Sequence, residues 1–221
     1  MNVQAIPNYL IVLVGYLLFY FFAHSLLASN SCKRWFALGW PAQSYAYRLY
    51  YNILALVMLL PIACLGAWYG QEPLWLWPRS VAWIADGLAV AALMGFIHSL
   101  QDYDLGLFSG VKQWRNRIKV TAVDEGFRIG FWHRYVRHPW YFFMLVLLWT
   151  REMDPFQLTL YLMISLYLVI GSRLEEAKLV ASYGSRYQQY QRLVPGLIPL
   201  PWRWLSKDKA ADLSADKNAN I

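Results

Sequence analysis

The chain has 221 residues and a net charge of +7; 58% of the residues are hydrophobic, 15% are charged, and the mean hydropathy is +0.30. Soluble domains usually carry about 25% charged residues, and here no Asp, Glu, Lys or Arg precedes Lys33. The two cysteines, Cys32 and Cys64, offer neither a metal-ligand spacing nor a disulfide framework, so we expect no metal site.

Five apolar segments follow one another along the chain, at residues 9–28, 50–69, 81–100, 139–150 and 155–171. Their apolar runs are continuous rather than alternating, which favours helices over the strands of a barrel. A helix needs about 20 apolar residues to cross a hydrocarbon core of about 30 Å. The sequence therefore predicts an all-α integral membrane protein with about five transmembrane helices.

Lysine and arginine are distributed unevenly between the loops. If the N-terminus lies outside, the inner segments 29–49, 101–138 and 172–221 contain 18 of the 20 basic residues, and only Arg79 and Arg151 lie outside. The positive-inside rule then places the C-terminus in the cytoplasm. The excess positive charge marks topology and contact with the lipid bilayer, and we expect no nucleic-acid partner.

The fourth and fifth segments predict a short C-terminal helical hairpin. Residues 139–150 form only about 18 Å of helix, too short to cross the membrane straight unless the helix begins earlier, near Phe131. Pro155 opens the next segment at a position where proline is tolerated. A short hairpin beside longer helices leaves a hollow at the cytoplasmic surface, where a small molecule can bind.

The chain is expected to divide by function at about residue 101. Residues 1–100 form a three-span N-terminal bundle. Residues 101–205 form a cytoplasmic loop, the hairpin and a cytoplasmic amphipathic helix, which together build the site. Residues 206–221 are polar and contain no aromatic residue, so we expect a disordered tail.

Arg137, His138 and Pro139 stand where the basic loop meets the fourth segment. Proline at a helix start leaves backbone N–H groups that bind carboxylates, and the two preceding side chains add cationic or donor groups. An arginine that extends to the membrane surface and an interfacial histidine would produce the same pattern, so function and structure both remain open on this motif alone.

Arg173, Glu175 and Glu176 follow the fifth segment. Two adjacent acids beside an otherwise basic face can bind a cationic ligand or act as a base. The ordinary alternative is a solvated helix turn in which Arg173 and Glu176 pair at i,i+3, and for this motif taken alone that alternative is preferred.

Tyr183, Tyr187 and Tyr190 share one face of the last predicted helix, at i, i+4 and i+7. Val194-Pro195-Gly196-Leu197 follows as a stiff, irregular segment. An amphipathic interfacial helix with aromatic anchors also explains the tyrosines.

Taken in order, the motifs R-H-P-x-Y, R-L-E-E-x-x-L, Y-G-x-x-Y-x-x-Y and V-P-x-L-I-P resemble the isoprenylcysteine carboxyl methyltransferase and phospholipid methyltransferase superfamily over residues 133–199. The N-terminal half is similar to a bacterial branch that contains methanethiol S-methyltransferases and NnrU-like membrane proteins. The residues that carry this second resemblance are His24-Ser25, Lys33-Arg34-Trp35, Tyr47-Arg48 and Asp104-Leu105.

The resemblance implies a methyltransferase of the bacterial inner membrane with a cytoplasm-facing S-adenosyl-L-methionine site. The residues that it assigns to cofactor binding are Arg137, His138, Tyr141, Tyr187, Val194, Pro195 and Leu197. Those that it places near methyl transfer are Arg173, Glu175 and Glu176. It implies a small or lipophilic acceptor, foremost a thiol such as methanethiol, and leaves the oligomeric state open.

One position departs from the superfamily pattern, because Phe143 stands where members typically have a small residue. A bulky ring here is expected to shrink or redirect the acceptor channel. A non-catalytic NnrU-like protein of nitrogen-oxide metabolism and an isoprenylcysteine or phospholipid methyltransferase therefore remain as alternatives. An NADPH-dependent sterol-type reductase fits less well, since those enzymes are larger and have more spans.

Three further polar residues lie inside apolar segments. A carboxylate within the membrane indicates function by default, but Asp86 lies toward the outer leaflet, and we expect it to pair with Tyr or Trp donors. His24 and His98 are expected to be interhelical hydrogen-bond partners.

Overall fold

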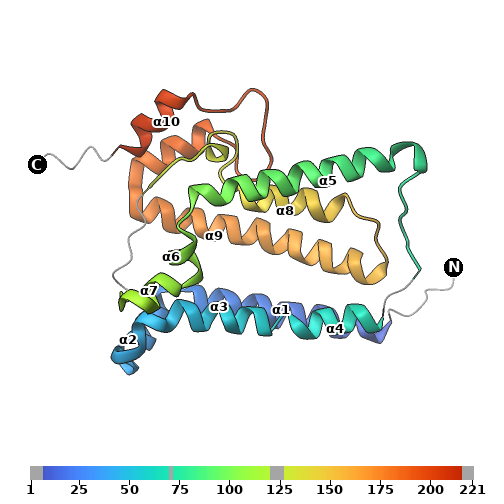
Figure 1. Cartoon of the computed structure of the whole chain (residues 1–221), viewed down its shortest axis with the longest axis horizontal. Helices are drawn as coiled ribbons and strands as arrows, with labels where there is room; N and C mark the ends of the chain where they lie inside the picture. The colour runs from blue at the N-terminus through green and yellow to red at the C-terminus, as the bar shows by residue number, and fades with distance from the viewer. Residues whose placement is uncertain (1–6, 70–71, 120–126, 216–221) are drawn as a thin grey trace, which may run out of the picture. The chain divides into compact units, whose positions relative to one another are not determined.

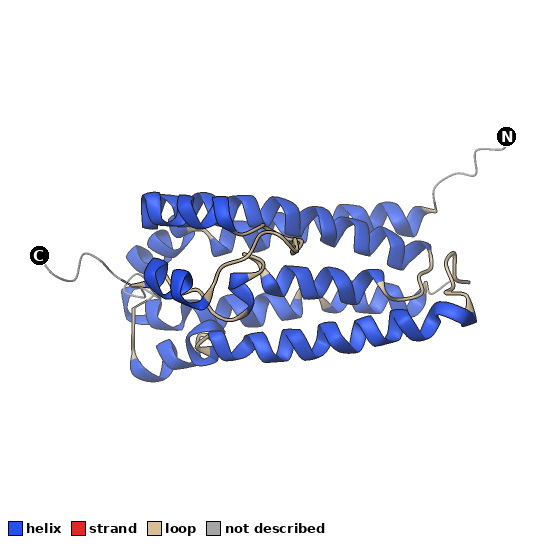
Figure 2. Cartoon of the chain, turned by 90° about the horizontal axis from the view of Figure 1, so that it is seen from above, coloured by secondary structure: helices blue, strands red, loops and turns tan. Residues whose placement is uncertain are grey.

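The computed structural model describes residues 7–69, 72–119 and 127–215. Every regular element within these ranges is a helix, and Figure 2 shows helices and loops. Four of the described stretches are long and apolar enough to cross a membrane: Asn8–Ala28, Pro41–Trp68, Arg79–Asp102 and Pro155–Leu193. A fifth apolar helix, Pro139–Trp149, is shorter. The prediction of an all-α integral membrane protein is confirmed.

The chain forms two compact units, each assembled from separate stretches of sequence. Unit 1 comprises Met1–Leu76, Tyr103–Asp124 and Glu152–Met163, and unit 2 comprises Trp77–Asp102, Glu125–Arg151 and Ile164–Ile221. This spatial grouping is distinct from the division by function at about residue 101, which stays a prediction.

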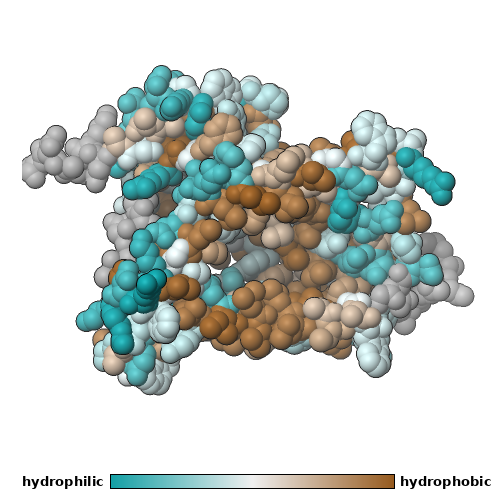
Figure 3. All heavy atoms as spheres, viewed as in Figure 1, coloured by the Kyte–Doolittle hydropathy of each residue, from teal (hydrophilic) through white to brown (hydrophobic). Residues whose placement is uncertain are grey.

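Unit 1 contains α1 (Asn8–Ala28), α2 (Asn30–Gly39), α3 (Tyr47–Val57), α4 (Leu60–Trp68), α6 (Leu105–Ser109), α7 (Val111–Asn116) and the first residues of α9 (Pro155–Leu193). Helix α1 runs alongside α3 and α4 (Figure 1). Leu13, Leu17, Ile62 and Phe156 form the buried core of this unit. Figure 3 shows hydrophobic side chains over α3 and α4, a surface suited to lipid.

The second span is divided into two helices at Met58 and Leu59. Pro61 stands in the first turn of α4, and proline can neither donate to the preceding turn nor avoid its carbonyl, which ends α3. The Tyr16 hydroxyl donates to the Met58 carbonyl across 2.8 Å. Within a membrane, a carbonyl freed by a break needs such a donor.

Unit 2 contains α5 (Arg79–Ser99), α8 (Pro139–Trp149), most of α9 and α10 (Lys207–Ser214). Helices α5 and α8 pack side by side (Figure 1), and the buried ring of Phe143 lies against Gly95 of α5. Helix α8 does not begin near Phe131, because a 3-10 turn at Trp132–Arg134 precedes it and it starts at Pro139. It therefore stays too short to cross the membrane straight.

Helix α9 joins the fifth apolar segment to the amphipathic segment after it. The backbone of Gly184 has φ 57° and ψ −134°, a conformation essentially confined to glycine. The helix therefore changes direction at this residue. The nine helical residues after Gly184 include Tyr187 and Tyr190, and both of these side chains are buried inside unit 2.

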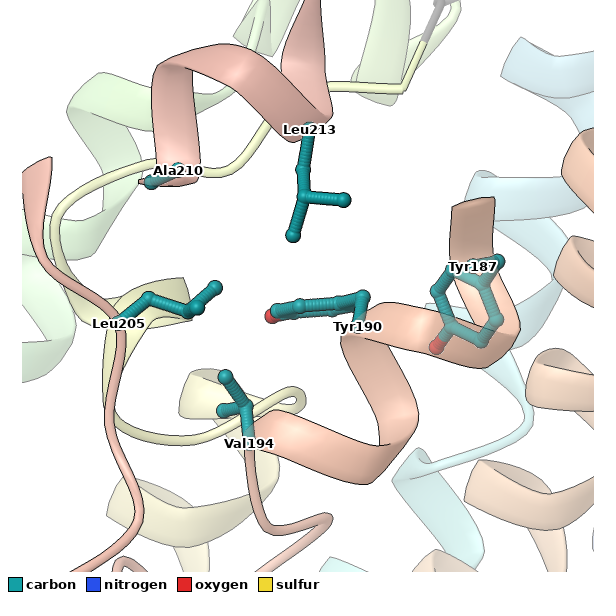
Figure 4. Packing of buried hydrophobic residues seen from close by; sticks show 6 residues of the cluster. All are labelled: Tyr187, Tyr190, Val194, Leu205, Ala210 and Leu213. Carbon is teal, nitrogen blue, oxygen red and sulfur yellow. The ribbon is translucent and has the colours of Figure 1, made fainter. Parts of the chain in front are cut away.

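A helix stands where the sequence predicted a disordered tail. Tyr187, Tyr190, Val194, Leu205, Ala210 and Leu213 form one buried cluster, in which Leu213 of α10 points toward Tyr190 (Figure 4). Ser206 caps α10 by accepting from the Lys209 N–H, 3.3 Å away. The tail is polar overall, yet its two buried apolar residues, Ala210 and Leu213, share one face of α10 and pack it against the cluster. Residues 216–221 of the predicted tail lie outside the described residues.

We expect Gly95→Ala to destabilise the protein, because the added Cβ would lie 2.5 Å from the Phe143 ring. Overpacking of this kind costs about 1–3 kcal/mol. Thermal unfolding in detergent micelles, followed by tryptophan fluorescence, measures the loss. Gly87→Ala is the matched control, since a Cβ there meets nothing within 4 Å. The packing interpretation predicts that Phe143→Leu restores stability to Gly95→Ala, and an additive double variant would contradict it.

Candidate functional site

The loop before α8 and the chain after α9 are held together by their backbones. The N–H of Arg137 donates to the Pro195 carbonyl at 2.9 Å, and the N–H of His138 donates to the Gly196 carbonyl at 3.1 Å. These two contacts bring together motifs that are almost 60 residues apart in sequence. All of the residues involved belong to unit 2.

Glu176 is the centre of this group. Its Oε1 accepts from Arg137 Nε at 2.7 Å and lies 3.0 Å from His138 Nε2, while its Oε2 accepts from Gln191 Nε2 at 2.9 Å. The side chains of Arg137 and Glu176 are only 12% and 14% exposed, so both charges are largely removed from water. Burial of a charge is tolerated when it is paired and its hydrogen bonds are satisfied.

Arg137 also closes the end of α9. Its Nη1 donates to the Gln191 carbonyl at 2.9 Å and to the Val194 carbonyl. Both carbonyls belong to the last turn of a helix or follow it, where carbonyl groups lack intrahelical partners. The guanidinium is therefore bonded to the Glu176 carboxylate and to two backbone carbonyls, and it holds the loop before α8 against the end of α9.

Glu175 has a more open environment than its neighbour. Its side chain is 49% exposed, and its Oε2 accepts from the Tyr141 hydroxyl at 3.2 Å. The same oxygen lies 3.5 Å from His138 Nδ1. The rings of His138 and Tyr141 are stacked, with centroids 5.2 Å apart and planes 11° from parallel. One acid thus faces solvent beside an aromatic pair.

His138 lies between these two carboxylates. Burial of the ring by itself lowers the pKa of His138, but the hydrogen bonds and negative charges of Glu175 and Glu176 outweigh burial and raise the pKa above 6.5. The imidazole and the two acids therefore form a coupled group in which the protonated ring is favoured.

The structure brings together most of the residues that the sequence singled out. The residues that meet as described are Arg137, His138, Tyr141, Glu175, Glu176, Val194 and Pro195. Tyr187 is buried and lies close enough to Arg137 and Glu176 to experience both charges. Arg173 is exposed and has no ion pair in the part of the chain that the structure describes, and Leu197 is half-buried.

Gln191 belongs to the site and was not predicted from the sequence. Its amide donates to Glu176, and its carbonyl accepts from Arg137 and from Arg203 Nη2 at 3.1 Å. A glutamine in a polar helix face is ordinary, so only the three-dimensional position of the end of α9 identifies it.

The polar residues of the apolar segments have separate partners. His24 of unit 1 lies 2.8 Å from the Tyr51 hydroxyl, a partner on another helix, as expected. Asp86 pairs with Arg151, 3.2 Å away, so the expectation of a Tyr or Trp donor was wrong. The arginine that ends the α8 segment reaches Asp86 and supplies the opposite charge.

We expect Glu176→Gln to destabilise the protein far more than Glu175→Gln does. Loss of one partner from a largely buried ion pair costs about 3 kcal/mol, whereas Glu175 keeps contact with water. Thermal unfolding of both variants in the same detergent measures the difference. Equal unfolding temperatures for the two variants would show that Glu176 is not the centre of the group.

The raised pKa of His138 predicts that stability depends on pH. A protonated His138 stabilises the folded state, so this contribution is complete below pH 6.5, the ordinary imidazole value, and is lost as pH rises through the higher folded-state pKa. The unfolding temperature should therefore fall above neutral pH. His138→Gln should flatten this dependence, and an unchanged slope in the variant would contradict the assignment.

Curated proteins of one kind are similar to this chain over most of its length. The chain is 34% identical over 206 residues to a methanethiol S-methyltransferase of Pseudomonas sp. (strain GM41(2012)), an alignment that covers 86% of this chain and 74% of the relative. It is 32% identical over 200 residues to that of Pseudomonas deceptionensis, with 86% and 73% covered. For methanethiol S-methyltransferase 2 of Bradyrhizobium diazoefficiens, the identity is 30% over 198 residues, with 85% and 73% covered.

No protein-family model matches the chain, and no solved structure matches it. The three relatives nevertheless align with 85–86% of this chain, and the chain in turn covers 73–74% of each relative. The chain therefore belongs to the family of membrane methyltransferases that contains the methanethiol S-methyltransferases.

Proposed function

We propose that this enzyme transfers a methyl group from S-adenosyl-L-methionine to a small thiol, with methanethiol as the leading acceptor. The observation that carries the proposal is the 30–34% identity to methanethiol S-methyltransferases over 85–86% of the chain. The acid and aromatic group of unit 2 supports it, since that group has features suited to a cationic methyl donor.

The donor set of the site fits S-adenosyl-L-methionine. Its sulfonium and ammonium groups are cationic, and the half-exposed carboxylate of Glu175 provides an acceptor of opposite charge. The stacked rings of His138 and Tyr141 and the apolar edges of Pro195 and Leu197 provide surfaces for adenine. We assign ligand contact to these five residues.

Glu176 and Arg137 have a supporting role in this proposal. Their side chains are saturated by His138, Gln191 and backbone carbonyls, so they hold the two segments of the site in register. Methyl transfer is an in-line displacement, in which positioning of the reactants and exclusion of water supply most of the acceleration. Small displacements of the supporting pair are therefore expected to reduce turnover.

We also propose that the site faces the cytoplasm of a bacterial cell and that the protein is held in the inner membrane. The positive-inside distribution supports this orientation, with 18 of the 20 basic residues on the side of the C-terminus. The bilayer and a small acceptor are the proposed partners. Arg173, exposed beyond the apolar part of α9, is proposed to lie near the mouth of the site.

The test uses purified protein in lipid nanodiscs with S-adenosyl-L-methionine labelled at the methyl group. We expect label to pass to methanethiol faster than to prenylcysteine carboxylate or phosphatidylethanolamine. Glu175→Gln should weaken binding of S-adenosylhomocysteine about tenfold, as expected for the loss of one charge-assisted contact of about 1.5 kcal/mol. Isothermal titration calorimetry measures the binding.

Glu152→Gln is the control, because Glu152 is exposed and its removal causes the same change in charge. It should bind S-adenosylhomocysteine like the wild type. Transfer to the carboxylate or the amine instead of the thiol would reassign the acceptor. A wild type that binds no S-adenosylhomocysteine would contradict the proposal and would favour a non-catalytic membrane protein.

A further inference from the structure

The proposed reaction requires the thiol acceptor to lose a proton, and this inference rests on that proposed function. A thiolate is the nucleophile, and an alkanethiol is mostly protonated at neutral pH. A nearby base is therefore useful, and imidazole is the side chain that exchanges protons in this range. The chain has four histidines with which to supply it.

Two of the four are assigned to other contacts. His24 belongs to unit 1 and lies against the Tyr51 hydroxyl. His138 lies between Glu175 and Glu176, and both of its ring nitrogens face carboxylate oxygens. A ring held protonated by two acids is a poor proton acceptor. The remaining histidines, His98 and His133, both belong to unit 2.

The hydrogen bond made by His98 fixes its tautomer. The indole N–H of Trp132 donates to His98 Nδ1 at 3.1 Å, and an indole can only donate. Nδ1 must therefore carry the lone pair, and neutral His98 has its proton on Nε2. While this bond is kept, His98 is a hydrogen-bond donor toward any further partner and is not suited to take a proton.

His133 has the opposite arrangement. Its Nδ1 lies 3.7 Å from Asp102 Oδ2, within ion-pair range but longer than a direct hydrogen bond. A carboxylate beside Nδ1 favours the proton on that nitrogen and leaves the lone pair on Nε2. The side chains are 16% and 23% exposed, so the pair is largely shielded from solvent.

Both members of this pair are held in place by their surroundings. Asp102 ends the turn after α5, and a side chain at Gly130 would overlap its carboxylate. The backbone carbonyl of His133 accepts from the Tyr190 hydroxyl at 2.6 Å. His133 therefore lies on the short segment that leads to His138 and is anchored to the buried cluster beside the site.

We propose that His133 is the general base of the reaction and that Asp102 is its positioning residue. His133 Nε2 takes the thiol proton, and the sulfur keeps the electron pair. The thiolate then attacks the donated methyl carbon; a new carbon–sulfur bond forms as the bond to the sulfonium breaks, and that electron pair returns to the donor sulfur. The imidazolium next to Asp102 releases its proton to solvent.

The neighbouring aromatic side chains favour a small acceptor at this position. Trp132 precedes His133, and its ring meets the ring of Phe143 edge to face, with centroids 5.0 Å apart. Phe143 is buried and fills the space beside Gly95. We place the acceptor against these two packed rings, an arrangement with room for a small group, which agrees with a one-carbon thiol.

The test measures kcat/KM for methanethiol against pH in the wild type, His133→Gln and Asp102→Asn. We expect His133→Gln to lose about 100-fold near neutral pH, the lower range for loss of a general base. Its rate should then rise toward that of the wild type at alkaline pH, where the thiol ionises unaided. The Asp102 carboxylate lies beside the His133 ring, so Asp102→Asn should show a smaller loss of the same form.

His98→Gln is the comparator, and its loss should not depend on pH. A loss in His133→Gln that is constant with pH, or no loss at all, would overturn the proposal, and so would a pH-dependent loss in His98→Gln alone. Affinity for S-adenosylhomocysteine should be unchanged in every variant, which separates this test from the donor site. A wild type that methylates no thiol would instead contradict the proposed function.

Discussion

Glu176 leaves the apolar part of α9 with its carboxylate largely shielded from water, and an ion in such a place is costly unless its lone pairs accept hydrogen bonds. Arg137, His138 and Gln191 supply those bonds. Because they come from the loop before α8 and from the far end of α9, one carboxylate determines how two distant stretches meet. The chain that follows α9, from Val194 onward, is held through the same arginine. Loss of the charge would therefore release several segments together.

Adjacent residues of a helix point in directions about 100° apart, and this separates the two acids into different tasks. Glu176 points into protein and is saturated, whereas Glu175 remains half exposed beside Tyr141. His138 contacts both carboxylates, so a change in the charge of the exposed Glu175 is coupled through the ring to the largely buried Glu176. An enzyme that binds a cation gains from this division, because the structural charge pair keeps its geometry when the ligand arrives or leaves.

The sequence was sufficient to predict the helical class, since the length and continuity of apolar runs follow directly from bilayer thickness. It also singled out the motifs around His138 and Glu176, because their order along the chain resembles a known methyltransferase superfamily. It could not separate Glu175 from Glu176, which differ only in the direction they face. Gln191 gave no signal, and the docking of α10 rests on two apolar residues whose partners lie elsewhere in the chain. Long-range packing of this kind has no local pattern.

Helix α10 is eight residues long, shorter than a helix that persists alone in water. It therefore depends on the cluster of Tyr190, Val194 and Leu205 for its existence, and it covers that cluster in return. The consequence concerns how the protein can be handled. An affinity tag or fluorescent fusion joined closely after Ser214 would strain a helix that is packed on the buried cluster of unit 2 rather than a passive tail. A tag ahead of α1 is attached to unit 1 and leaves the packing of α10 in unit 2 undisturbed.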